Sequence, residues 1–184
     1  MKQTESLTNR QIRRLLRNSL RGDTRAFRSI VETYQSYAYA LAYRILAQQE
    51  DAEDVVQDAF LRVWRHAADY KPGIKFTTWL YSIVSNLCYD RLRMRQRQNE
   101  FSTAGEPENL SDTPLQGDAA GGLLHNIHRV LRDLPHQQQM VFILRDLQDL
   151  SVKEVASILD ISESAVKSNL HYARKQLRGL LKDL

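Results

Sequence analysis

The chain of 184 residues has 42% hydrophobic and 26% charged residues, a composition typical of globular proteins. It contains no apolar run near the roughly 18 residues that span a bilayer, and its polar start lacks the apolar core of a signal peptide. We therefore expect a cytoplasmic protein without a membrane span of its own. Cys88 is the only cysteine, which excludes an intramolecular disulfide.

The formal net charge of +4 is unevenly distributed along the chain. Residues 1–98 contain 17 basic and 10 acidic residues, residues 99–121 contain 5 acidic and no basic residues, and residues 122–184 contain 9 basic and 7 acidic residues. Two basic lobes favour a polyanionic partner, whereas the acidic connector argues against one continuous surface that coats nucleic acid. Because residues 99–122 are rich in Gly, Pro, Ser and acids, they are a predicted linker.

An N-terminal basic extension, residues 1–22, precedes the first predicted domain. Its segment 10–20 has apolar residues on one side and arginines around the rest, which fits either a short docking helix or a frayed basic tail. From Asp23, a candidate N-cap, to Ala47, apolar residues recur at spacings of three and four. This pattern predicts a core-facing helix. Its buried stripe would contain Phe27, Ile30, Val31, Tyr34, Ala38, Leu41 and Ile45.

The next predicted helix covers residues 50–67 and begins with acids, which favour the positive end of a helix dipole. The apolar positions expected to face inward are Val55, Val56, Ala59, Phe60, Val63 and Trp64. The outer face is left with Asp54, Gln57, Asp58, Leu61, Arg62 and Arg65. The spacing alone fits a solvated surface and a partner-binding surface equally well, although only the second explains an exposed Leu61.

After a loop over residues 69–75, residues 76–98 form a third predicted helix, with Thr77 or Thr78 as its N-cap. The basic residues of its second half are Arg91, Arg93, Arg95 and Arg97, and no acid follows Asp90 within this segment. Cations at a helix C-terminus are favoured by the dipole. Four guanidiniums exceed that need, however, and fit phosphate contacts better.

Residues 123–147 predict two further helices, broken between Leu134 and Pro135. His125 and His128 stand three positions apart, but no further ligand with metal-site spacing accompanies them. We therefore expect no metal site. The sequence also offers no group of residues typical of a catalytic centre, and it indicates no cofactor.

Residues 151–181 have the pattern of two helices joined by a tight turn. Ser151 and Glu154 form a capping box, Asp160-Ile161 make the turn, and Ser162 caps the second helix. The buried stripe of the second helix would be Val166, Leu170, Ala173, Leu177 and Leu181. Its other face carries Ser164, Lys167, Ser168, His171, Arg174, Lys175 and Arg178. This face suits a DNA major groove, and a helical hairpin with a solvated basic face is the alternative.

Three segments, in this order, resemble the extracytoplasmic-function (ECF) sigma factors, which are compact specificity subunits of bacterial RNA polymerase. The stretch "DAEDVVQDAFLRVW" is similar to their core-binding segment, "KFTTWLYSIVSNLCYDRLR" to their promoter-melting segment, and residues 134–177 to their region four. The resemblance implies an all-α protein of two small helical domains. Region two would cover residues 23–98 and the helix-turn-helix region four residues 123–184, joined by the flexible acidic linker 99–122.

The resemblance also implies roles for individual residues. Those that would bind core polymerase are Asp54, Gln57, Asp58, Leu61 and Arg62. Those that would bind the minus-ten DNA element are Lys75, Trp79, Asn86, Arg91, Arg93, Arg95 and Arg97. Those that would face the minus-thirty-five element are Ser164, Lys167, Ser168, His171, Arg174 and Lys175. Region two would capture a base that has left the duplex stack.

The implied partners are promoter DNA, core RNA polymerase and an anti-sigma factor, which would be able to hold the protein at the inner membrane. Polymerase would be bound through the clamp helices of its largest subunit and the flap of its second-largest subunit, and it would perform the catalysis. Two positions depart from the family: Asp160 replaces a common Gly, and Asn169 replaces a frequent Arg. A regulator that binds DNA alone and, more remotely, a recombinase are the rival interpretations.

Overall fold

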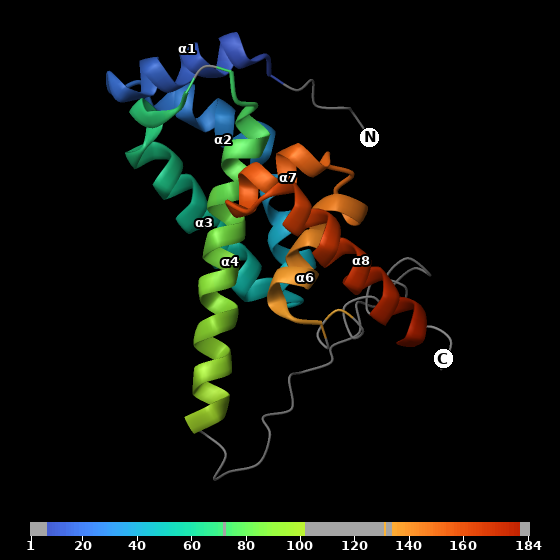
Figure 1. Cartoon of the computed structure of the whole chain (residues 1–184). Coiled ribbons are helices and arrows are strands. Elements are labelled where there is room, and N and C mark those ends of the chain that lie inside the picture. Colours follow the sequence, from blue (N-terminus) through green and yellow to red (C-terminus); the bar gives the residue numbers. More distant parts are fainter. Residues whose placement is uncertain (1–6, 72, 102–130, 132–133, 181–184) are drawn as a thin grey trace, which may run out of the picture. The chain divides into compact units, whose positions relative to one another are not determined.

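The computed structural model describes residues 7–71, 73–101, 131 and 134–180. All regular structure in these ranges is helical, without a strand among them, so the predicted all-α class is confirmed (Figure 1). The chain divides into two compact units, one built mainly of residues 1–88 and the other mainly of residues 89–184. Within the described ranges no helix is long and apolar enough to cross a membrane.

The first unit begins with α1 (Asn9–Leu20), which is a packed helix and not a frayed tail. Thr8 and Gln11 form a reciprocal capping box at its start. The Gln11 N–H donates to Thr8 Oγ1 at 3.3 Å, and the Thr8 N–H donates to Gln11 Oε1 at 2.8 Å. Ile12 and Leu16 are only 1% and 2% exposed, because this side of α1 packs against α2 (Thr24–Leu46).

Helices α2 and α3 (Gln49–Arg65) pack against each other and supply most of the first core. Asp23 caps α2 as predicted, since its Oδ1 accepts the N–H groups of Arg25 at 3.0 Å and Ala26 at 3.1 Å. The predicted stripes are confirmed at Ile30, Tyr34, Ala38, Leu41, Ile45, Val55, Ala59, Phe60 and Val63, all of which are buried. Phe27, Val31 and Val56, predicted for the same stripes, are only partly buried. Trp64, predicted to face inward, lies at the rim with 36% exposure, and its ring meets Phe27 edge-on at 4.7 Å.

A short turn of helix, η1 (Ala67–Asp69), leads through a loop into α4 (Phe76–Phe101). The predicted N-cap of α4 is wrong, because the helix begins at Phe76 and places Thr77 and Thr78 inside its first turn. The Phe76 ring is buried between those of Tyr34 and Tyr70, with centroids 4.9 Å and 5.8 Å away. Aromatic packing therefore fixes this helix start, which a search for capping side chains does not detect.

The second unit is built mainly of α6 (His136–Phe142), the π-helix η2 (Ile143–Leu147), the first part of α7 (Val152–Leu159) and α8 (Glu163–Leu180). It also includes α4 from Tyr89 onward, whereas Ser157–Asp160 group with the first unit. The predicted break is confirmed, since Pro135 is the N-cap of α6. The predicted capping box before α7 is also confirmed. The Glu154 N–H donates to Ser151 Oγ at 3.2 Å, and the Ser151 N–H donates to Glu154 Oε2 at 3.0 Å.

The turn between α7 and α8 follows the predicted pattern. Asp160 adopts the left-handed conformation with φ of 52°, and Ser162 Oγ accepts the Ala165 N–H at 3.1 Å. The buried stripe of α8 is confirmed at Val166, Leu170, Ala173 and Leu177, while Leu181 lies outside the described residues. His125, His128 and the predicted linker beyond residue 101 also lie outside them.

Candidate nucleic-acid and protein interfaces

The five residues predicted to bind core polymerase lie on one surface of α3. This α3 outer face consists of Asp54, Gln57, Asp58, Leu61 and Arg62, all exposed. They recur at spacings of three and four, opposite the buried side of the helix. Leu61 is 53% exposed among charged and polar neighbours. An exposed leucine within a polar surround is typical of a protein interface.

The loop before α4 is held by the side chain of Tyr70, which is 8% exposed. Its hydroxyl donates to the Ile74 carbonyl at 2.7 Å and lies 3.3 Å from Asn9 Oδ1 on α1. Burial raises the pKa of this phenol, and nearby Arg13 partly offsets the effect. The Tyr70 hydroxyl thus links two residues of the loop to each other and to α1.

Trp79, predicted to contact the minus-ten element, is only partly exposed. Its ring lies 5.3 Å from that of Tyr70 and 5.9 Å from that of Phe76, so packing restricts its orientation. Lys75 and Asn86, four positions before and seven positions after Trp79, are exposed. Trp79 is therefore a partly exposed aromatic ring with neighbours that restrict its orientation, and aromatic rings are the groups on which bases stack.

The arginines of α4 form a separate group. Arg93 and Arg97 are exposed, and Arg91 and Arg95 are partly exposed. At 1.5 Å of rise per residue, Trp79 and Arg97 lie about 27 Å apart along the helix axis. The structure therefore distributes the predicted minus-ten residues along one helix and does not gather them into a single pocket.

The predicted minus-thirty-five residues share the exposed side of α8. This α8 free face consists of Ser164, Lys167, Ser168, His171, Arg174 and Lys175. Asn169 does not extend it, because its side-chain amide donates to the Ala165 carbonyl at 2.9 Å on its own helix. Tyr172, which the sequence reasoning missed, is 55% exposed, with its ring edge-on to His171 at 5.7 Å. In the sequence, Tyr172 is marked by its position as an aromatic residue just outside the apolar stripe of this helix.

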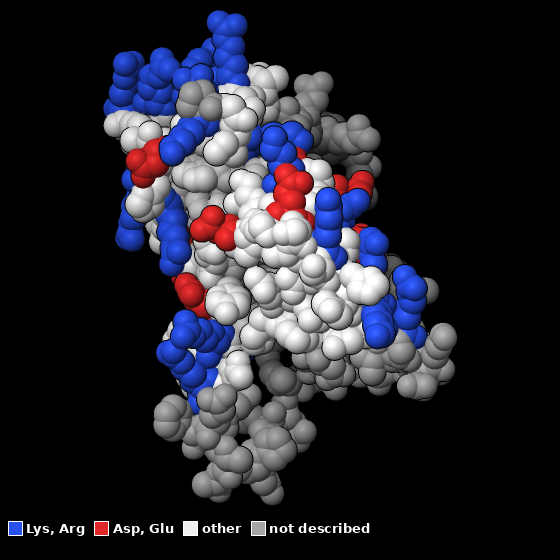
Figure 2. All heavy atoms as spheres, in the orientation of Figure 1, with Lys and Arg blue, Asp and Glu red and all other residues white. Residues whose placement is uncertain are grey.

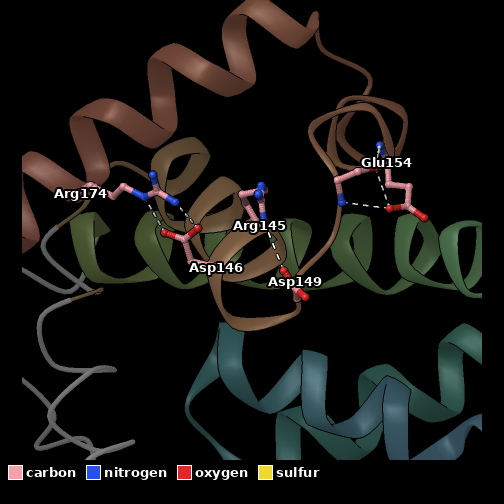
Figure 3. A network of polar contacts seen from close by, with 6 residues as sticks. Arg145, Asp146, Asp149, Glu154 and Arg174 are labelled. Carbon is pink, nitrogen blue, oxygen red and sulfur yellow. Dashed lines mark hydrogen bonds and ion pairs between the residues drawn. The ribbon is translucent and has the colours of Figure 1, made fainter.

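Arg174 has an intramolecular partner that the sequence reasoning also missed. Its Nε and Nη2 donate to the two carboxylate oxygens of Asp146 on η2, at 2.8 Å and 2.7 Å (Figure 3). The hydrogen bond to Asp146 raises the pKa of the Arg174 guanidinium. Because Nε and Nη2, on one edge of this cation, both bond to Asp146, Arg174 links α8 to η2 as well as lying on the α8 free face.

A second ion pair nearby is weaker. Arg145 Nη1 lies 3.5 Å from Asp149 Oδ1, a single contact to a fully exposed carboxylate (Figure 3). Asp146 and Arg174 are 28 positions apart, so the helical periodicity of the sequence does not indicate that they pair. Only the fold reveals that pair.

In the described ranges, no group of three His, Cys, Asp or Glu side chains is placed to hold a metal ion.

Comparisons with known proteins agree with this architecture. The chain matches the sigma-70 region 2 family over residues 30–98 and the sigma-70 region 4 family over residues 124–177. The ECF RNA polymerase sigma factor SigW of Bacillus subtilis is 32% identical over 183 residues, which cover 94% of this chain and 98% of that relative.

Two solved structures are similar over most of their length. The sigma factor RpoE of Bartonella quintana, in complex with the anti-sigma factor NepR, is 26% identical with a TM-score of 0.70, over 85% of this chain and 96% of that one. CnrH, in complex with the cytosolic domain of CnrY, is 27% identical with a TM-score of 0.69, over 94% of this chain and 98% of that one. The chain therefore belongs to the ECF group of the sigma-70 family, whose members direct promoter-specific transcription initiation.

Proposed function

We propose that this sigma factor binds core RNA polymerase through the α3 outer face and holds promoter DNA at two separate places. The observation that carries the first part is the surface of α3 itself, on which an exposed leucine lies among acids, an amide and an arginine. Such a face offers apolar contact together with oriented charges, which give a protein interface its specificity. Its partner would be the clamp helices of the largest polymerase subunit.

The first DNA site is the minus-ten element. The segment 70–75 and Trp79 would receive an unstacked base, because Trp79 is already packed against Tyr70 and Phe76 and loses little freedom on binding. Farther along α4, the arginines would hold the backbone of the melted strand by phosphate contacts. The chain would not cleave or form bonds, because nucleotidyl transfer belongs to the polymerase.

The second DNA site is the minus-thirty-five element, read by the α8 free face. Lys167 and Ser168 lie in the first half of α8 after its Ser162 cap, where a reader helix approaches base edges. Arg174 would hold the position of α8 through the guanidinium edge that bonds to Asp146, and its remaining N–H groups would face the minus-thirty-five element. The flap of the second-largest polymerase subunit would support this unit. The region four domain would span residues 123–184, with residues 23–98 forming the region two domain.

An anti-sigma factor is the proposed regulatory partner. The solved relatives RpoE and CnrH are bound to NepR and to the cytosolic domain of CnrY, respectively. By likeness, an inhibitor of this chain would cover one or more of its polymerase-binding surfaces. The proposed location is the cytoplasm, with retention at the inner membrane whenever the anti-sigma factor is anchored there.

The test of the polymerase interface is the double variant Asp54→Ala with Gln57→Ala. Both side chains are exposed, so the fold should persist in this variant. Its affinity for core polymerase should fall at least about tenfold, which corresponds to about 1.4 kcal/mol of binding free energy. The matched control is Glu32→Ala with Gln35→Ala, an exposed acid and amide with the same spacing on α2. Equal affinities of both variants, measured by fluorescence anisotropy with labelled protein, would refute this interface.

A further inference from the structure

Helix α1 carries four arginines on one side. Arg10, Arg13, Arg14 and Arg17 follow the spacing i, i+3, i+4, i+7, which places them on a single helical face, and all four are exposed. The opposite side of α1 is buried in the bundle. Figure 2 shows basic side chains gathered over α1. We call this surface the α1 arginine face.

Local helix energetics do not explain this arrangement. The first turn of α1 contains Arg10 and no acid, although the positive end of a helix dipole disfavours cations. Arginines three and four positions apart also repel one another. Only Arg17, in the last turn, is placed where the dipole favours it. An arrangement that opposes helix stability at several positions indicates that the face is used for binding an anion.

The position of α1 in the first unit narrows the choice of anion. α1 packs against η1 as well as α2, and Asn9 lies 3.3 Å from the Tyr70 hydroxyl that also holds the Ile74 carbonyl. Arg13 is near enough to Tyr70 to influence its ionisation. Helix α1, which carries the arginine face, therefore contacts Tyr70, a residue of the proposed minus-ten site, through Asn9. Helix α1 lies before residues 30–98, so the match to the sigma-70 region 2 family does not include it.

We infer that the α1 arginine face binds the phosphate backbone of promoter DNA beside the minus-ten element. This inference rests on the proposed function. Arg10 to Arg17 span about 10 Å of helix axis, and a DNA duplex carries about six phosphates over that length. Guanidinium groups fit phosphate with paired hydrogen bonds. A membrane surface fits less well, because the apolar side of α1 is buried and leaves no face to insert.

The test uses the full chain assembled with core polymerase and a labelled promoter fragment. All four arginines are changed to Gln in one variant and to Lys in a second variant that keeps the charge. We expect the Gln variant to bind DNA more weakly. The logarithm of its affinity should also fall less steeply with the logarithm of salt concentration, by about 0.9 for each duplex phosphate that the variant no longer neutralises. The Lys variant should retain most of the salt dependence.

Several results would overturn the inference. One is an unchanged DNA affinity and salt slope for the Gln variant, while the wild-type complex initiates at promoters. Another is weaker binding to core polymerase in the absence of DNA, which would make the face a protein interface. Circular dichroism of the free chain checks that α1 stays folded. Failure of the proposed function is distinguishable, because the wild-type complex itself would then show no promoter-specific initiation.

Discussion

At the scale of single residues, the ion pair between Arg174 and Asp146 gives Arg174 a role in holding α8 in position. We expect a coupling free energy of about 1 kcal/mol in a double-mutant cycle of Arg174→Gln and Asp146→Asn, at the upper end for surface pairs because the contact is bidentate. Urea unfolding of the full chain measures it. The Arg145 and Asp149 pair is the control, with expected coupling near zero. Additive effects of the first two substitutions would contradict the positioning role.

For Lys167 we expect an effect on DNA binding and none on stability, since its side chain is exposed on the α8 free face and would contact DNA in the proposed function. Lys167→Gln should weaken binding to a promoter with an intact minus-thirty-five element by about 1 to 3 kcal/mol, the usual size of one base contact, without changing the free energy of unfolding. Competition binding with promoters substituted at single positions measures the effect. Unchanged affinity for every promoter would remove Lys167 from the reader surface.

At the scale of elements, the turn between α7 and α8 depends on a residue that tolerates positive φ. Asp160 has φ of 52°. Asp160→Gly should leave the free energy of unfolding unchanged or slightly higher. Asp160→Val should lower it by about 1 to 2 kcal/mol, because a β-branched side chain is strained in the left-handed region. Equal stability of the two variants in urea unfolding would show that this turn relaxes.

The sequence allowed the elements with local signals to be predicted. Asp23, Ser151 and Ser162 act as caps in the structure because a capping hydrogen bond joins residues only two or three positions apart. The start of α4 was not predictable in this way, since aromatic rings from other elements fix Phe76. For the same reason the choice between a docked and a frayed α1 needed the tertiary structure, in which Ile12 and Leu16 find their partners.

The candidate sites were predictable to a similar extent. The exposed faces of α3 and α8 followed from helical periodicity, which also gives the side that is buried. Membership of the ECF group sets aside the rival interpretations as a lone DNA-binding regulator or a recombinase. What periodicity could not give was the partner of Arg174, because Asp146 lies 28 positions away and meets it only through the fold.

At the scale of the whole molecule, buried phenols make stability depend on alkaline pH. Burial raises the pKa of Tyr81 above its usual value of about 10, and Tyr70 is raised in the same sense. The folded state then holds these protons more tightly than the unfolded state. The free energy of unfolding should therefore be fully retained below about pH 10 and should fall as the pH rises beyond it.

Tyr81→Phe tests this dependence, because it removes the titrating hydroxyl and keeps the buried ring. Above about pH 10, the free energy of unfolding of the variant should decline less steeply than that of the wild type. Urea unfolding followed by circular dichroism measures both curves. Parallel curves would show that Tyr81 contributes nothing to the alkaline loss of stability.

The most direct test of the whole account is run-off transcription with purified core polymerase on a library of promoters. We predict transcripts only from promoters that share specific minus-ten and minus-thirty-five sequences. Asp54→Ala with Gln57→Ala should abolish most of this output, whereas the Glu32→Ala with Gln35→Ala control should preserve it. Transcription no different from that of core polymerase alone would contradict the account, as would equal output from the two double variants.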